Sequence, residues 1–185
     1  MRASRQLAAL AVAAACLAAA CGAPAASVPS GDWTTFDYNA QRSGVGPADT
    51  GISAANLHTL RRIAVKIPGT VDSSAVELAG VAVAGASRDV AIMTTSYGRT
   101  LALDAASGRV LWDFAPRSVQ QLQGGSQITT ASPVVDPDRR YVYAASPDGF
   151  IHKLSVASGR QLWSTRVTYD PGREKIAGGL NIADG

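Results

Sequence analysis

Cysteine is nearly absent from this sequence. The only two, Cys16 and Cys21, fall within the first 21 of its 185 residues. The rest of the chain can form no disulfide, no thiolate metal site and no haem-attachment motif. Packing and hydrogen bonding must therefore hold that part together.

Runs of basic residues are also lacking. The chain has 17 Lys+Arg against 14 Asp+Glu, and without Arg2 and Arg5 near the N-terminus the ratio becomes 15 to 14. A nearly neutral chain without a basic stripe does not fit phosphate-backbone binding, so we expect no nucleic-acid partner.

Histidine is scarce, and this limits acid–base and metal chemistry. His58 and His152 are far apart, and the pattern around His152 predicts a half-exposed strand residue. No serine–histidine–aspartate arrangement is evident. Asp136 and Asp138, in "DPDRR", are typical of a hairpin loop, and an acidic metal site there is the alternative.

The first 21 residues have the pattern of an export signal. Arg2 and Arg5 precede an uncharged apolar run over 7–20. That run is too short to span a membrane comfortably, and its charged flank is typical of a signal peptide. We therefore expect an exported protein.

Two cleavage sites remain open. "LAAAC", ending at Cys21, resembles a bacterial lipobox, although Leu17 lies four residues before the cysteine rather than three. The resemblance implies lipidation of Cys21 and a membrane anchor. Ordinary cleavage after "APA", ending at Ala25, would instead release a periplasmic or extracellular protein. Residues 22–31 form a small-residue linker in either case.

A repeat organises the rest of the chain. "GRTLALDAASGRVLWDF" begins at Gly98, and "GFIHKLSVASGRQLWST" begins at Gly149. The two strings align at an offset of 51 residues. The turn glycines and tryptophans that recur are Gly108 and Gly159, and Trp112 and Trp163.

Each copy predicts four short strands. β-Branched and aromatic runs alternate with glycine turns, as in antiparallel hairpins. The first strands, "SSAVEL" at 73–78 and "ASPVVD" at 131–136, are offset by 58 instead. We place the extra seven residues in a longer first loop, "AGVAVAGASRD".

Four strands per unit of about fifty residues predict an all-β fold, an incomplete β-propeller. Trp112 and Trp163 then act as wedges between neighbouring blades. The expected regions are a lead-in segment with a short helix and a first strand (32–72), blade repeats over 73–116 and 117–167, and the start of a truncated next blade (168–185).

The repeat resembles the tryptophan-docking motif of pyrroloquinoline-quinone (PQQ) type propellers. "LALDAASGRVLW" carries it, and Asp104 matches the aspartate of the family, where the second copy has Ser155. The enzymes of that family hold PQQ beside Ca²⁺ on the propeller axis, often under a vicinal cysteine pair that this chain lacks. No catalytic or metal-binding residue can be matched.

The lead-in segment has a resemblance of its own. Residues 32–60, "DWTTFDYNAQRSGVGPADTGISAANLHTL", look like the N-terminal segment of quinoprotein alcohol dehydrogenases. "SAANLHTL" predicts one or two helical turns with Ser53 as N-cap and with Leu57 and Leu60 facing inward.

Two function classes remain open. One is a non-catalytic binding or scaffold module, with other envelope proteins or further blades as partners, as propeller lipoproteins of outer-membrane protein assembly imply. The other is the N-terminal part of a PQQ-dependent dehydrogenase of alcohols or sugars, with PQQ and Ca²⁺ bound only in a complete propeller. The tail "GGLNIADG" at 178–185 predicts the first strand of a further blade and hence a longer propeller. Gln127, Thr129 and Thr130 either enter a strand or face an axial site.

Overall fold

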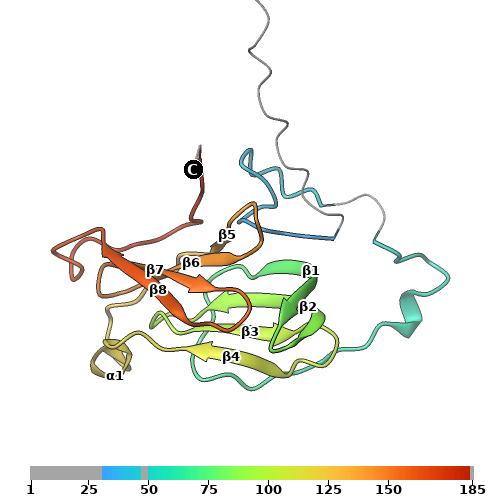
Figure 1. Ribbon diagram of the computed structural model, residues 1–185, viewed down its shortest axis with the longest axis horizontal. Coiled ribbons are helices and arrows are strands. Elements are labelled where there is room, and N and C mark those ends of the chain that lie inside the picture. Colours follow the sequence, from blue (N-terminus) through green and yellow to red (C-terminus); the bar gives the residue numbers. More distant parts are fainter. Residues whose placement is uncertain (1–30, 47–49, 184–185) are drawn as a thin grey trace, which may run out of the picture.

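Two four-stranded antiparallel sheets make up most of the molecule (Figure 1). The computed structural model describes residues 31–46 and 50–183. Each sheet follows the order of the sequence, as in a propeller blade, and the predicted all-β fold is confirmed. The first sheet contains β1 (Val76–Val83), β2 (Ala86–Thr94), β3 (Thr100–Asp104) and β4 (Val110–Phe114), and the second contains β5 (Val134–Val135), β6 (Tyr141–Ser146), β7 (Phe150–Ser155) and β8 (Gln161–Arg166).

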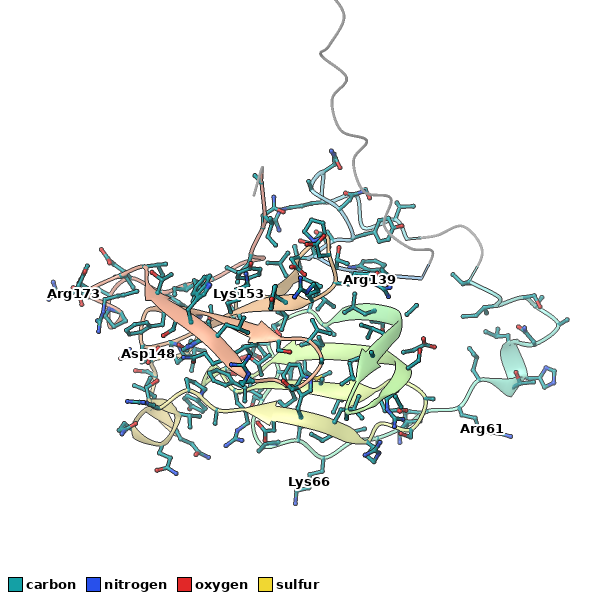
Figure 2. All side chains as sticks on the ribbon, in the orientation of Figure 1. Arg61, Lys66, Arg139, Asp148, Lys153 and Arg173 are labelled. Atoms are coloured by element: carbon teal, nitrogen blue, oxygen red, sulfur yellow. The ribbon has the colours of Figure 1, made fainter. Side chains whose placement is uncertain are left out.

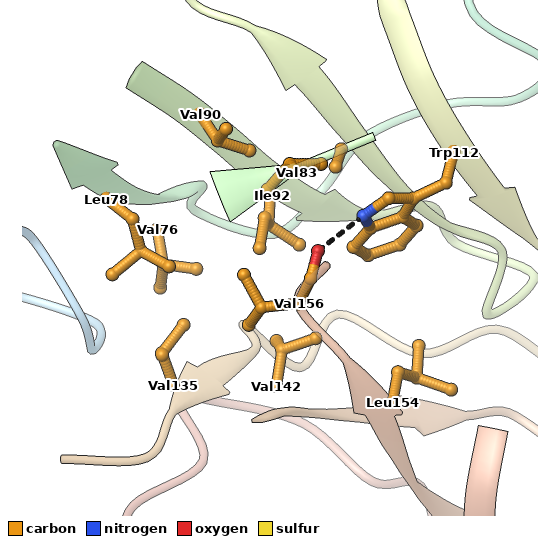
Figure 3. Packing of buried hydrophobic residues seen from close by; sticks show 11 residues of the cluster. Val76, Leu78, Val83, Val90, Ile92, Trp112, Val135, Val142, Leu154 and Val156 are labelled. Atoms are coloured by element: carbon orange, nitrogen blue, oxygen red, sulfur yellow. Dashed lines mark hydrogen bonds between the residues drawn. The ribbon is translucent and has the colours of Figure 1, made fainter. Parts of the chain in front are cut away.

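The hydrophobic core lies between the two sheets (Figure 3). Strand side chains alternate between faces, so one face of each sheet collects the apolar residues of its strands. Because burying aliphatic side chains is the main favourable term in folding, this layer joins the blades. The labelled members are Val76, Leu78, Val83, Val90, Ile92 and Trp112 from the first sheet, and Val135, Val142, Leu154 and Val156 from the second.

The first hairpin differs from the prediction. The seven extra residues do not form a loop, because β1 continues to Val83 and β2 begins at Ala86. Ala84 and Gly85 make the turn with positive φ angles of 50° and 81°, as a tight hairpin needs. The Ala84 N–H donates to the Ala157 carbonyl at 3.1 Å, so the lengthened hairpin reaches the second sheet.

The lead-in segment has little regular structure. Its helix is a single 3₁₀ turn, η1 (Leu57–Thr59), and its strand is one bridge between Trp33 and Glu77. Leu57 and Leu60 are 58% and 56% exposed, so the prediction that they face inward was wrong. The signal peptide, Cys21 and nearly all of the 22–31 linker lie outside the described residues.

The tail returns to the lead-in segment. Gly179 forms a parallel bridge with Ser132, and the Arg42 guanidinium donates to the Gly179 carbonyl at 3.1 Å. The C-terminal trace accordingly ends beside the lead-in segment (Figure 1). A four-residue helix, α1 (Val119–Leu122), joins the sheets, and no helix within the described residues is long and apolar enough to cross a membrane.

Candidate functional site

The Trp112 side chain packs between the two blades and joins them. Its indole N–H donates to the Val156 carbonyl at 2.8 Å, and the residue is 8% exposed (Figure 3). Gly159 lies directly beneath the ring, since a Cβ there would stand 2.6 Å from a ring carbon. Tryptophan and glycine therefore form a complementary pair, in which a large flat side chain fills the space that the glycine leaves.

Trp163 occupies the same place on β8 but stays 42% exposed. Its ring lies 5.8 Å from that of Tyr143, on the face of the second sheet that points away from the first. Val167 and Tyr169, which follow β8, are 54% and 89% exposed. The face around Trp163 is therefore open to solvent, whereas the face around Trp112 is covered by the second blade.

The lead-in segment covers the turn of the first blade that corresponds to the Gly159 turn. A Cβ on Gly108 would stand 2.5 Å from Val65 Cγ2 and 2.9 Å from Ile63 Cγ2. Aliphatic side chains thus take the position over Gly108 that the Trp112 ring takes over Gly159.

Asp104 stabilises the first of the two motif turns. Its Oδ1 accepts from the Ser107 N–H at 2.9 Å and from the Ser107 hydroxyl at 2.8 Å, and its Oδ2 pairs with Arg88 at 3.0 Å. The Ser107 hydrogen bonds, followed by Arg88, hold the pKa of Asp104 below its usual value. Ser155, at the same position in the second blade, cannot provide this charge.

A buried ion pair ties the lead-in segment to both blades. The Asp32 carboxylate is fully buried and pairs with Arg139 Nε at 2.8 Å, while its Oδ1 accepts from the Ala79 N–H at 2.8 Å. Arg139 also donates to the Ala79 carbonyl. Arg139 lies beside the lead-in segment in Figure 2.

His152 is buried between the blades and is not half-exposed as predicted. It is 6% exposed, with Nε2 at 2.7 Å from Ser146 Oγ and Nδ1 at 3.0 Å from Gln161 Oε1. The Phe114 ring of the first blade lies 5.1 Å away. Burial lowers the pKa of His152 despite the opposing effects of Gln161 and Asp148. The fully buried Ser146 hydroxyl also donates to Asp148 Oδ1, so it links this carboxylate to the imidazole.

Comparison with known proteins decides the family. The model of the family described as outer membrane protein assembly factor BamB matches residues 66–184, more than half of the chain. The chain belongs to this family. No curated protein matches it. Like other members, it is built from PQQ-type propeller repeats, which confirms the resemblance seen in the sequence.

Two solved structures show the same fold over the part that they share with this chain. Quinohemoprotein alcohol dehydrogenase from Comamonas testosteroni is similar with a TM-score of 0.56 and 19% identity over 78% of this chain. Its counterpart ADHIIG from Pseudomonas putida HK5 gives 0.59 and 20% over 76%. BamB from Moraxella catarrhalis is 29% identical over 42% of this chain, with a TM-score of 0.32. The chain spans about 20% of the length of each of these structures.

The weaker candidate residues of this family member do not converge. His58 is exposed on η1, and Asp136 Oδ1 accepts from the backbone of its own hairpin, which is a loop role. Asp138 is exposed in that hairpin, and no group of three or more metal-ligating side chains forms among the described residues.

Two of the polar residues ahead of β5 donate hydrogen bonds to backbone carbonyls. Gln127 donates to the Pro147 carbonyl at 2.7 Å, and the Thr129 hydroxyl donates to the Ile176 carbonyl at 2.8 Å. Thr130 between them is half-buried. Sequence reasoning missed the Asp32–Arg139 pair, because the partners are 107 residues apart and share no motif.

Proposed function

We propose that this chain is an exported, lipid-anchored propeller repeat protein that acts as a binding or scaffold module in the cell envelope. The description of its family, an outer-membrane assembly factor, and the lipobox-like Cys21 support the location. The exposed face around Trp163 carries the binding role, because the corresponding Trp112 is buried by a neighbouring blade.

The chemistry of that face differs from the face that Trp112 shares. At the offset of 51 residues, the aliphatic positions of the first blade become aromatic or charged in the second. Lys153 lies with its ammonium 4.1 Å from the centre of the Tyr141 ring, in a cation–π contact (Figure 2). The exchanges are Val90 to Tyr141, Ile92 to Tyr143, and Ala102 to Lys153.

This face therefore suits a protein surface that has both aromatic and acidic groups. A buried ammonium without a partner is costly, so a layer that covers Lys153 must bring a carboxylate. Tyrosine and tryptophan are enriched at the centres of protein interfaces. The partner we propose is another envelope protein or a further blade with an acidic residue opposite Lys153.

Site-specific photocrosslinking in cells tests the binding role. A photoreactive amino acid replaces Trp163 in one variant and exposed Gln120 on α1 in the control. We expect a defined adduct in the membrane fraction from position 163 only, lost in Lys153→Glu. Equal adducts from both positions, or none from 163, would contradict the proposal.

The anchor has its own test. Cys21→Ser should move the protein from the membrane fraction to the soluble fraction and abolish incorporation of radiolabelled palmitate, whereas Cys16→Ser should change neither. A parent chain that lies in the soluble fraction and takes up no palmitate would rule out the lipid anchor and favour ordinary cleavage after Ala25.

The second candidate is the N-terminal part of a PQQ-dependent dehydrogenase. The likeness to the Comamonas enzyme covers 78% of 185 residues, about 144, whereas the family model matches 119 (66–184), so the likeness includes part of the lead-in segment. Reconstitution with PQQ and Ca²⁺, followed by dye reduction with alcohols or sugars, tests this candidate. Turnover that depends on the quinone would favour the enzyme over the scaffold.

A further inference from the structure

A cavity of about 580 Å³ lies where the first hairpin meets the turns of the second blade. Three arginines line it together with one acidic residue, Asp138. Val81, Val156 and Leu162 add an apolar wall. The arginines are Arg139, Arg140 and Arg160.

Comparison of the two blades explains why this cavity is basic. Asp104 and Asp89 of the first blade become Ser155 and Arg140 in the second, at the offset of 51 residues. The backbone is the same in both copies. The N–H of Asp104 donates to Arg109 and that of Ser155 to Arg160, both at 2.9 Å. The second blade thus loses two carboxylates at this position and gains one guanidinium.

The cavity carries more positive than negative charge, because Asp138 supplies one carboxylate against three guanidinium groups. Asp32 holds Arg139. Within the described residues, neither Arg140 nor Arg160 forms an ion pair, and the Arg140 guanidinium lies over the Tyr141 ring at 5.3 Å. In the first blade, by contrast, the Asp104 carboxylate pairs with Arg88 and accepts from Ser107.

We propose that this cavity binds a phosphate group, which takes the place of the carboxylate lost at Ser155. Guanidinium groups donate paired hydrogen bonds that match phosphate oxygens, and the Ser155 hydroxyl adds a further donor beside them. Free phosphate and the headgroup of an anionic phospholipid share this chemistry. The cavity borders the Trp163 face at Tyr141, but the phosphate proposal does not rest on the proposed scaffold role.

Titration calorimetry of the full chain with inorganic phosphate is the first arm of the test. We expect Arg160→Gln to weaken binding roughly tenfold or more. Ser155→Asp, which restores the carboxylate of the first blade, should abolish binding while it leaves the fold intact by circular dichroism. Arg109→Gln is the matched control, since Arg109 holds the same motif position outside the cavity, and it should bind like the parent.

Co-sedimentation with vesicles is the second arm. Phosphatidylglycerol vesicles are compared with phosphatidylcholine vesicles for the parent chain and Ser155→Asp, both of which carry the same N-terminal segment. Calorimetric binding without a vesicle difference assigns free phosphate. A loss of phosphatidylglycerol binding in Ser155→Asp assigns the lipid headgroup. Binding in neither arm, or binding that Ser155→Asp and Arg109→Gln change equally, overturns the proposal.

Discussion

At the scale of single residues, the turn glycines differ in what stands against them. Gly159 and Gly124 both have positive φ angles, of 69° and 84°. A Cβ on Gly159 would meet the Trp112 ring at 2.6 Å, whereas a Cβ on Gly124 would meet nothing within 4 Å. Backbone strain is therefore common to both positions, and steric conflict is specific to Gly159.

Gly159→Ala should accordingly be more damaging than Gly124→Ala. We expect the free energy of unfolding to fall by about 1–3 kcal/mol more in Gly159→Ala, the range for overpacking a tight site. Urea denaturation followed by circular dichroism measures both variants. Equal losses would mean that the ring and the glycine are not in contact.

His152 should make stability depend on pH. Because burial lowers the pKa of His152 in the folded chain below its usual value of 6.5, the unfolded chain takes up the proton first as the pH falls. The free energy of unfolding should therefore decrease as the pH falls through 6.5. It should stop decreasing once the pH is below the folded pKa of His152. Denaturant midpoints between pH 7.5 and 5 measure this, and His152→Leu should flatten the curve. An unchanged slope in that variant would contradict the assignment.

The repeat predicted some of these residues and not others. Trp112 and Gly159 both belong to the repeated motif, and its fixed offset indicated the docking tryptophan and the turn glycine. His152 was expected to be half-exposed because a single histidine in an alternating strand fits either face. The available signal was that its counterpart at the same offset is a leucine, Leu101, which the structure shows to be fully buried.

At the scale of elements, β4 and β8 carry the same tryptophan in different surroundings. Trp112→Ala should lower the free energy of unfolding by about 3–5 kcal/mol, because it empties a packed joint. Trp163→Ala in the purified chain should cost about 1 kcal/mol or less, since the side chain is already partly in water. Chemical denaturation compares the free energies of unfolding of the two variants. Equal losses would contradict the claim that only Trp112 packs between the blades.

The packing of the lead-in segment against the blades should depend on the ion pair between Asp32 and Arg139. Asp32→Asn leaves Arg139 without its charge partner beside the Ala79 carbonyl. Because the Arg139 side chain is 25% exposed, we expect a loss of about 1–3 kcal/mol, below the range for a fully buried pair. Asp170→Asn is the control, because its pair with Arg173 is exposed and long at 3.9 Å. Thermal unfolding should shift strongly for the first variant only. Similar shifts would refute the role given to Asp32.

Element boundaries were predictable where the pattern was local. β4 is the short run "VLWDF", which follows the glycine turn at Gly108 within the repeated motif. The first hairpin was misassigned because its extra residues, "AGVAVAGASRD", contain glycines, yet their alternation continues β1 past the bulge between Leu78 and Val81. The leucines of η1 face outward because no layer of the described chain covers them.

At the scale of the molecule, two blades stack through one layer. Each blade is a local unit of sequence, so the fold class could be predicted from the repeat. The candidate site could not be predicted in this way. The basic cavity joins residues of both blades, and the Asp32–Arg139 pair adds the lead-in segment. The residues that cover the Trp163 face belong to the proposed partner.

The most direct measurement is fluorine NMR of the chain with its three tryptophans labelled with 5-fluorotryptophan. Tryptophan-to-phenylalanine variants assign the signals, and the shift between H₂O and D₂O reports the solvent contact of each ring. We expect almost no shift for the Trp112 signal and a large shift for the Trp163 signal. Equal solvent contact at both rings would contradict the claim that the same docking residue is filled in the first blade and open in the second.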